Sequence, residues 1–136
     1  MRYALFIIIL CLFACRVGKE NEKIQICIKI VSDEVSTKTS FDEIYLGSAM
    51  DGRIISIDGF FSFGFEDIAL YPEKDDHSKK GLWLIFNREV MAKDSLLKKL
   101  NGRKVNITGK VDLLNKGHLN YYYGTISNVT CIQQIN

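Results

Sequence analysis

Two segments of the sequence, 51–59 and 101–109, follow the same pattern and constrain the fold more than any other feature. Each opens with a turn dipeptide (Asp-Gly or Asn-Gly), continues with alternating apolar residues and closes on a glycine. Alternation indicates a half-buried β-strand, and a glycine within a strand marks a bulge or sharp bend, with which small barrels turn their corners. Two copies are too few for a solenoid. We therefore expect two similarly built strands in one small barrel.

The remaining elements complete a mainly β chain with one helix. Apolar runs and turn residues predict strands at 53–63, 67–72, 82–86, 103–112 and 119–132, and a helix over 88–100. Three strands, a helix and two strands is the order of the OB-fold. Isoleucine at every second position from 24 to 30 predicts an extra N-terminal strand, and 32–42 reads as a loop or short helix. We expect an OB-like β-barrel domain spanning 23–136.

Residues 49–130 also resemble a family of uncharacterised bacterial proteins that contain an OB-like domain. The matching stretches are Asp51-Gly52-Arg53, Ile57-Asp58-Gly59-Phe60, Phe65-Glu66-Asp67-Ile68-Ala69-Leu70-Tyr71, Leu82-Trp83-Leu84, Gly117-His118 and Ile126-Ser127-Asn128-Val129-Thr130. The resemblance implies the same fold as the strand order does. It brings no catalytic residues or activity to this chain.

The first fifteen residues have the layout of a lipoprotein signal peptide. Arg2 precedes an apolar run over 4–14, which is shorter than the roughly 20 residues of a transmembrane span. Leu12-Phe13-Ala14-Cys15 resembles the lipobox of bacterial lipoproteins, in which the cut falls before the cysteine and its sulfur carries diacylglycerol. We expect a signal peptide at 1–14, lipidation of Cys15 and a tether over 15–22. A plain secretory signal cleaved near Ala14 is the alternative.

These features predict a lipid-anchored protein of the bacterial cell envelope. Arg16 after the lipidated cysteine is compatible with export to the outer membrane in a Gram-negative bacterium. The 18 basic and 16 acidic residues nearly balance and are interspersed, which does not fit a nucleic-acid-binding protein. We therefore expect the membrane as a partner, through the N-terminal lipid, and no nucleic acid.

Two cysteines, Cys27 and Cys131, lie near the two ends of the expected domain. In an oxidising compartment they can pair, and the bridge would close a loop of about 100 residues. Two separate buried thiols are the alternative, because free cysteine is often part of a core.

The candidate binding residues are Tyr121, Tyr122, Tyr123 and His118. If the three tyrosines lie in a strand, they alternate between its faces, so at least one meets solvent and suits a recognition surface. His118 follows a turn glycine. The aromatic segment 60–65 is either a stacking platform or core, and alternation favours core. Asp75-Asp76-His77 matches no metal motif, and lysines flank it.

The sequence contains no established catalytic motif. We expect a non-catalytic binding module for a protein or glycan partner, with loop residues around 73–80 and 115–122 forming its surface. We expect no catalytic residue, bound metal or cofactor. An immunity or inhibitor lipoprotein that blocks one toxin or enzyme is the alternative, and a hydrolase or metal-dependent enzyme is a third, weaker one.

Overall fold

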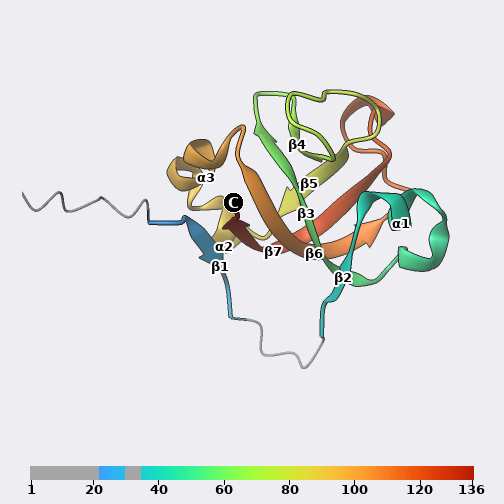
Figure 1. The fold of residues 1–136 in the computed structure, drawn as a ribbon, viewed down its shortest axis with the longest axis horizontal. Helices are drawn as coiled ribbons and strands as arrows, with labels where there is room; N and C mark the ends of the chain where they lie inside the picture. Colours follow the sequence, from blue (N-terminus) through green and yellow to red (C-terminus); the bar gives the residue numbers. More distant parts are fainter. Residues whose placement is uncertain (1–21, 30–34) are drawn as a thin grey trace, which may run out of the picture.

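Five strands close into a barrel in the computed structural model, which describes residues 22–29 and 35–136 (Figure 1). These strands are β3 (Ile54–Phe63), β4 (Ile68–Tyr71), β5 (Leu82–Phe86), β6 (Lys104–Asp112) and β7 (Gly124–Gln134). Around the barrel they run β3–β4–β5–β7–β6 and back to β3. Only the β5–β7 pair is parallel among these neighbours. The predicted OB-like barrel is confirmed, with strand ends within two residues of expectation except at β7.

The two similar segments of the sequence are neighbours in the barrel, because β3 and β6 pair antiparallel. Ile57 faces Ile107, and these are equivalent positions of the two segments, so a local two-fold axis relates them. Both turn glycines adopt the left-handed conformation, with φ of 76° at Gly52 and 73° at Gly102. Glycine takes this conformation without steric cost, which explains both turn dipeptides.

Asp51 and Asn101, the residues before the two turn glycines, accept equivalent hydrogen bonds through their side chains. Leu113 N–H donates to Asp51 Oδ1 at 2.8 Å, and Phe63 N–H donates to Asn101 Oδ1 at 2.8 Å. Each turn therefore caps the end of the partner strand. The second turn fixes the end of β3, immediately before the loop that carries part of the candidate site.

The two strand glycines differ in their role. At Gly109 the β6–β7 register shifts, as predicted, and Asn128 on β7 takes a φ of 46° within the irregularity. At Gly59 the register with β6 is unbroken, so of the two predicted alternatives, a bulge or a bend, no bulge stands there. A Cβ at Gly59 would lie 2.7 Å from the Leu70 side chain and 2.8 Å from the Tyr71 carbonyl oxygen. Close packing of β4 on β3 therefore explains Gly59.

Two short helices, α2 (Arg88–Met91) and α3 (Asp94–Leu100), stand where one helix over 88–100 was predicted. The prediction of a continuous helix is wrong because the chain breaks at Lys93, where ψ is 37°. Asp94 then begins a new helix, and acidic residues are favourable in a first turn. Val90, Leu97 and Leu100 of these helices are buried in the core.

Segments before the barrel add two edge strands. β1 (Gln25–Cys27) pairs antiparallel with β7, so the predicted extra strand joins the sheet. β2 (Thr37–Thr39) pairs parallel with β3 and was not predicted. It leads into α1 (Phe41–Tyr45), which begins with a Ser40–Glu43 capping box, and then η1 (Ser48–Met50). The predictions for the signal peptide, Cys15 and nearly all of the tether lie outside the described residues.

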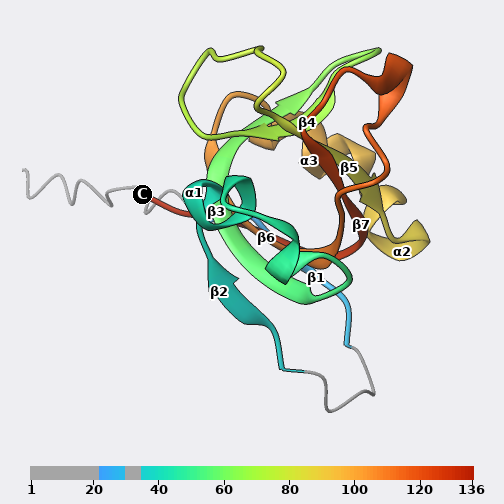
Figure 2. The same cartoon turned by 90° about the vertical axis from the view of Figure 1, so that its right-hand side faces the viewer.

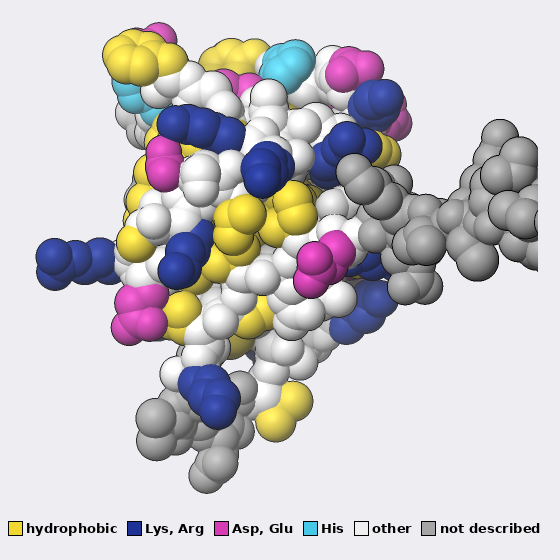
Figure 3. Space-filling model, turned by 90° about the vertical axis from the view of Figure 1, so that its left-hand side faces the viewer, with side chains coloured by type: hydrophobic (Ala, Val, Ile, Leu, Met, Phe, Trp, Pro, Cys, Tyr) yellow, Lys and Arg dark blue, Asp and Glu magenta, His cyan; other side chains and the backbone are white. Residues whose placement is uncertain are grey.

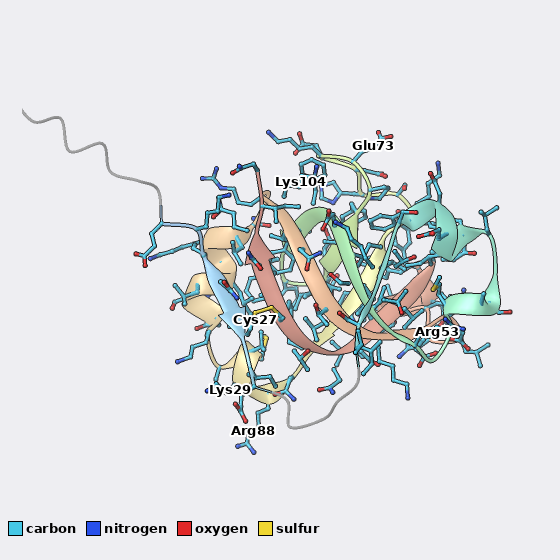
Figure 4. All side chains as sticks on the ribbon, turned by 60° about the horizontal axis from the view of Figure 1, so that its bottom comes forward. Cys27, Lys29, Arg53, Glu73, Arg88 and Lys104 are labelled. Carbon is cyan, nitrogen blue, oxygen red and sulfur yellow. A yellow bond between two sulfur atoms is a disulfide. The ribbon has the colours of Figure 1, made fainter. Side chains whose placement is uncertain are left out.

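Cys27 and Cys131 lie directly opposite each other on β1 and β7, with Cα atoms 4.0 Å apart. Their sulfurs are at bonding distance and form the disulfide drawn in yellow in Figure 4. The bridge is thus favoured over the alternative of two separate thiols.

Alternate residues of the barrel strands, joined by residues of the helices, fill one core. Its largest fully buried side chains are Phe61, Ile44, Ile55, Ile57, Leu70, Leu82, Leu97, Leu100, Ile107, Ile126, Ile132 and Val90. Within the described part of the chain, no helix is long and apolar enough to cross a membrane.

A candidate binding surface around Asp67

Three loops meet beside the outer face of β4 and β5. They are 64–67, 72–81 and 113–123, which join β3 to β4, β4 to β5 and β6 to β7. Figures 1 and 2 both show the loops of 72–81 (yellow-green) and 113–123 (orange to red) at the top of the barrel. In OB-folds the faces of the second and third barrel strands, with the loops corresponding to 64–67 and 113–123, commonly bind ligands.

The carboxylate of Asp67 joins these loops. Its Oδ1 accepts hydrogen bonds from Tyr71 OH at 2.6 Å and Tyr122 OH at 2.9 Å. Its Oδ2 accepts one from Ser62 Oγ at 2.6 Å, and His77 Nδ1 lies 3.1 Å away. An ionised carboxylate has about four acceptor positions, so these four neighbours fill them. Asp67 therefore organises the surface and has no acceptor position left for a ligand.

The hydrogen bonds also set the ionisation of the cluster. Burial alone raises the pKa of Asp67, but the hydrogen bonds from Ser62, Tyr71, Tyr122 and His77 outweigh it, and the pKa falls below its ordinary value. Burial, followed by the hydrogen bond to Asp67, raises the pKa of both Tyr71 and Tyr122. At neutral pH Asp67 is therefore ionised, and the hydroxyls of Tyr71 and Tyr122 are neutral donors.

The lowered pKa predicts that Asp67 stabilises the fold above about pH 4 and stops doing so as the pH falls through its folded-state pKa. Asp67→Asn has no such titration. We expect the wild type to have a higher free energy of unfolding than Asp67→Asn at about pH 6, and this difference should be smaller at about pH 2.5. Denaturant unfolding at the two pH values measures it. An equal difference at both pH values would contradict the assigned ionisation.

A layer of aromatic rings supports the loop 113–123. Tyr122 packs on Trp83 of β5 with ring centroids 5.1 Å apart, and the His118 ring stacks on the same indole at 6.1 Å. Gly117 has a φ of 66°, and a Cβ there would collide with Trp83 and Tyr122. The glycine before His118 therefore lets the loop lie against β5.

Further hydrogen bonds hold the loop 72–81 in place. Tyr121 OH donates to the His77 carbonyl oxygen at 2.8 Å, and Tyr45 OH of α1 donates to the Lys80 carbonyl oxygen at 2.6 Å. Tyr123 N–H donates to the carbonyl oxygen of Gly81 at 3.0 Å. The surface is thus a network across the loops rather than independent loop tips.

The structure places the three predicted tyrosines differently from the prediction. The chain turns at 118–120 and β7 begins only at Gly124, so the prediction of a strand from 119 is wrong. Leu119 and Asn120 have φ of 54° and 55°, which a strand cannot accommodate. Tyr121 is 40% exposed, whereas Tyr122 is buried and Tyr123 is half-buried. The expectation that at least one tyrosine meets solvent is confirmed.

His118 does lie at the candidate surface, with its Nε2 3.9 Å from Glu66 Oε1. Cys27 and Cys131 lie on β1 and β7, away from the three loops, and take no part in it. His77 pairs with Asp67 instead of completing a metal site. Across residues 22–29 and 35–136, no group of three or more His, Cys, Asp or Glu side chains is placed to hold a metal ion.

A pocket of about 360 Å³ opens among these residues. It is lined by Glu66, Asp67, both histidines, Leu119 and the tyrosines Tyr71, Tyr121 and Tyr122. Leu119, which lines the pocket, is 83% exposed, and Phe65, which precedes Glu66 in the sequence, is 99% exposed. Figure 3 shows histidine side chains (cyan) beside hydrophobic ones (yellow) at the top of the molecule.

Sequence reasoning missed the role of Asp67. It favoured core for the aromatic segment 60–65, which holds for Phe61 but is wrong for Phe65, since Phe65 is fully exposed. In a strand the adjacent carboxylates Glu66 and Asp67 point to opposite faces, which predicts a poor acid–base pair and gives no sign of a hydrogen-bond centre. The one available signal was an aromatic residue following Gly64 at the end of a strand, where a turn exposes it.

No protein-family model matches the chain, and no curated protein or solved structure matches it. The resemblance of residues 49–130 to bacterial OB-like proteins therefore stays a prediction.

Proposed function

We propose that this protein is an envelope lipoprotein, anchored through lipid on Cys15, whose barrel binds another protein without catalysing a reaction. The binding face is the Asp67 surface, defined as Phe65, Glu66, His118, Leu119 and Tyr121 around the Asp67 network. The observation that carries the proposal is the exposure of Leu119, which lines the pocket, and of Phe65, on the loop that contributes Glu66 to it. Large apolar side chains exposed together on an otherwise hydrogen-bonded framework are typical of interaction sites.

The same residues favour a protein partner over a glycan. Sugars stack on the open faces of aromatic rings; Trp83 is covered by His118 and Tyr122, which leaves Phe65 as the fully exposed ring of this surface. Lys79 lies over the Tyr121 ring, with its Nζ 5.8 Å from the centroid. Phe65 and Leu119 offer instead the isolated apolar contacts that fill pockets on a partner protein.

The position of the surface suits an anchored protein. β1 follows the proposed tether, and both Figures 1 and 2 show β1 on the lower side of the barrel, away from the loops at the top. The tether would thus enter the barrel on the side away from the Asp67 surface.

A crosslinking pull-down of the full-length tagged chain from its own envelope tests the proposal. We expect one protein to be captured by the wild type and by Val35→Ala, and not by Phe65→Ala/Leu119→Ala. Val35 is a matched control because it is 88% exposed but lies beside the start of β3, at the other end of that strand from Phe65.

Equal capture by the double variant would overturn the Asp67 surface as the binding face, and retention of glycan alone would overturn the protein partner. A single stoichiometric partner that is a toxin or enzyme, and whose activity the complex blocks, would favour the immunity or inhibitor role.

A further inference from the structure

We infer that the Cys27–Cys131 disulfide is a site of thiol–disulfide exchange, at which a dithiol reductant attacks Cys27 and thereby loosens β1 from the barrel. The bridge lies on β1 and β7, away from the loops of the Asp67 surface, and the inference does not depend on binding at that surface. It assigns a reaction to the bridge in addition to its contribution to stability.

The bridge lies on the outer face of the sheet, where a reductant can reach it. Side chains alternate along a strand, and Ile26 of β1 is buried in the core opposite Ile132 of β7. Cys27 therefore points to the other side of β1, and its side chain is exposed, whereas Cys131 is half-buried. A thiol from solution thus meets the sulfur of Cys27 first.

The strand order also favours attack on Cys27. A thiolate displaces one sulfur of a disulfide from the side opposite that leaving sulfur. The two cysteines face each other across β1 and β7, so their bond runs across the strands. Beyond β1 no further strand follows in the described part of the chain, which leaves the approach to Cys27 open at the edge. The approach to Cys131 passes over β6, where Thr108 is its partner.

Two neighbours on the outer face of β1 suit this reaction. Gln25 Nε2 donates a hydrogen bond to Cys27 Sγ at 3.4 Å. Lys29, two residues beyond Cys27, is exposed on the same side of the extended chain. Since the attacking group is an anion, the Lys29 ammonium group attracts it toward Cys27.

The exchange has two steps. In the first, one thiolate of the reductant bonds to Cys27 Sγ, the disulfide bond breaks, and Cys131 leaves as a thiolate that takes up a proton. In the second, the other thiolate of the reductant attacks the reductant's own sulfur in this mixed disulfide and releases Cys27, which is protonated in turn. The dithiol is oxidised to a disulfide by two electrons, and the bridge is reduced to two thiols.

Reduction leaves β1 with few other attachments. Its pairing with β7 spans residues 25–27. This pairing is flanked by a hydrogen bond from Ile28 N–H to the Thr130 carbonyl oxygen at 2.9 Å and one from Gln134 N–H to the Ile24 carbonyl oxygen at 2.8 Å. The five barrel strands close on one another without β1. The reduced protein should therefore open at β1 while the barrel stays folded.

Glutathione, a monothiol that stops at the mixed disulfide, tests the direction of attack on the full-length chain. Free thiols are blocked rapidly with iodoacetamide, and peptide mass spectrometry locates the two groups. We expect about fivefold more glutathione on Cys27 than on Cys131, with Cys131 carrying the alkyl group. Equal labelling of the two cysteines, or more glutathione on Cys131, would overturn the inference.

The contribution of Lys29 has its own comparison. At low ionic strength Lys29→Gln should form the mixed disulfide about twofold more slowly than the wild type, because glutathione is anionic and salt does not screen the attraction. Lys74→Gln, which removes an exposed lysine from the loop 72–81, is the matched control and should react as the wild type does. Equal rates for all three proteins would remove Lys29 from the site.

Dithiothreitol, a dithiol, completes the reduction and tests the release of β1. Hydrogen exchange of the oxidised and reduced full-length chain is compared under conditions in which both are folded. We expect the Ile28 amide and those of β1 to exchange about tenfold faster after reduction, with β3 and β6 unchanged. Unchanged exchange in β1, or equal loss of protection in β3 and β6, would overturn the local release.

Discussion

Loss of the Cys27–Cys131 bridge is expected to lower the free energy of unfolding by about 4 kcal/mol. The two cysteines are 104 residues apart in sequence, so the bridge restricts nearly the whole unfolded domain. β1 is a short edge strand of three residues, held by its pairing with β7 and the burial of Ile26, and the bridge reinforces it. Cys27→Ser/Cys131→Ser should therefore unfold at lower denaturant concentration and lose amide protection first in β1.

Oxidised and reduced wild-type protein provide the matched comparison for this double variant. The reduced protein should unfold with the same midpoint as the variant, because both lack only the crosslink. Coinciding midpoints for oxidised and reduced protein would contradict a bridge that stabilises the domain.

Asp67→Ala is expected to lower the free energy of unfolding by about 3 kcal/mol. The substitution leaves the hydroxyls of Ser62, Tyr71 and Tyr122 without their common acceptor, and Tyr122 is buried. Hydrogen bonds to charged groups contribute more than neutral ones, and an unsatisfied buried donor has its own cost. Denaturant unfolding gives the size of the effect, and amide exchange locates it.

The adjacent residue is the control for Asp67. Glu66→Ala removes an exposed carboxylate with no hydrogen bond in the network, so its stability should stay within about 0.5 kcal/mol of wild type. In Asp67→Ala, amide protection should fall in the loops 64–67 and 113–123 while β6 remains protected. Uniform loss of protection across the barrel would show that Asp67 does not act through these loops.

Much of the barrel could be predicted because its signals are local. The Asp-Gly and Asn-Gly turns need positive φ at Gly52 and Gly102, and the alternation that follows each of them fixes which face is buried. The pairing of the two segments around Ile57 and Ile107 follows from the strand order of an OB-like barrel.

The candidate surface was harder to predict because it depends on contacts between distant residues. Leu119 and Asn120 take positive φ without being glycine, so the sequence there resembled a continuing strand. Asp67 joins distant loops because the side chain of Tyr122, 55 residues away, reaches it. Adjacent carboxylates in a sequence give no sign of which one will be surrounded by donors.

The central claim is that Phe65 and Leu119 contact a protein partner, and site-specific photocrosslinking in the native cells tests it most directly. A photoreactive amino acid would replace Leu119 in one strain and Val35 in another. We predict one discrete protein adduct from position 119 and none from position 35. Adducts from position 35 alone, or from neither position, would contradict the account.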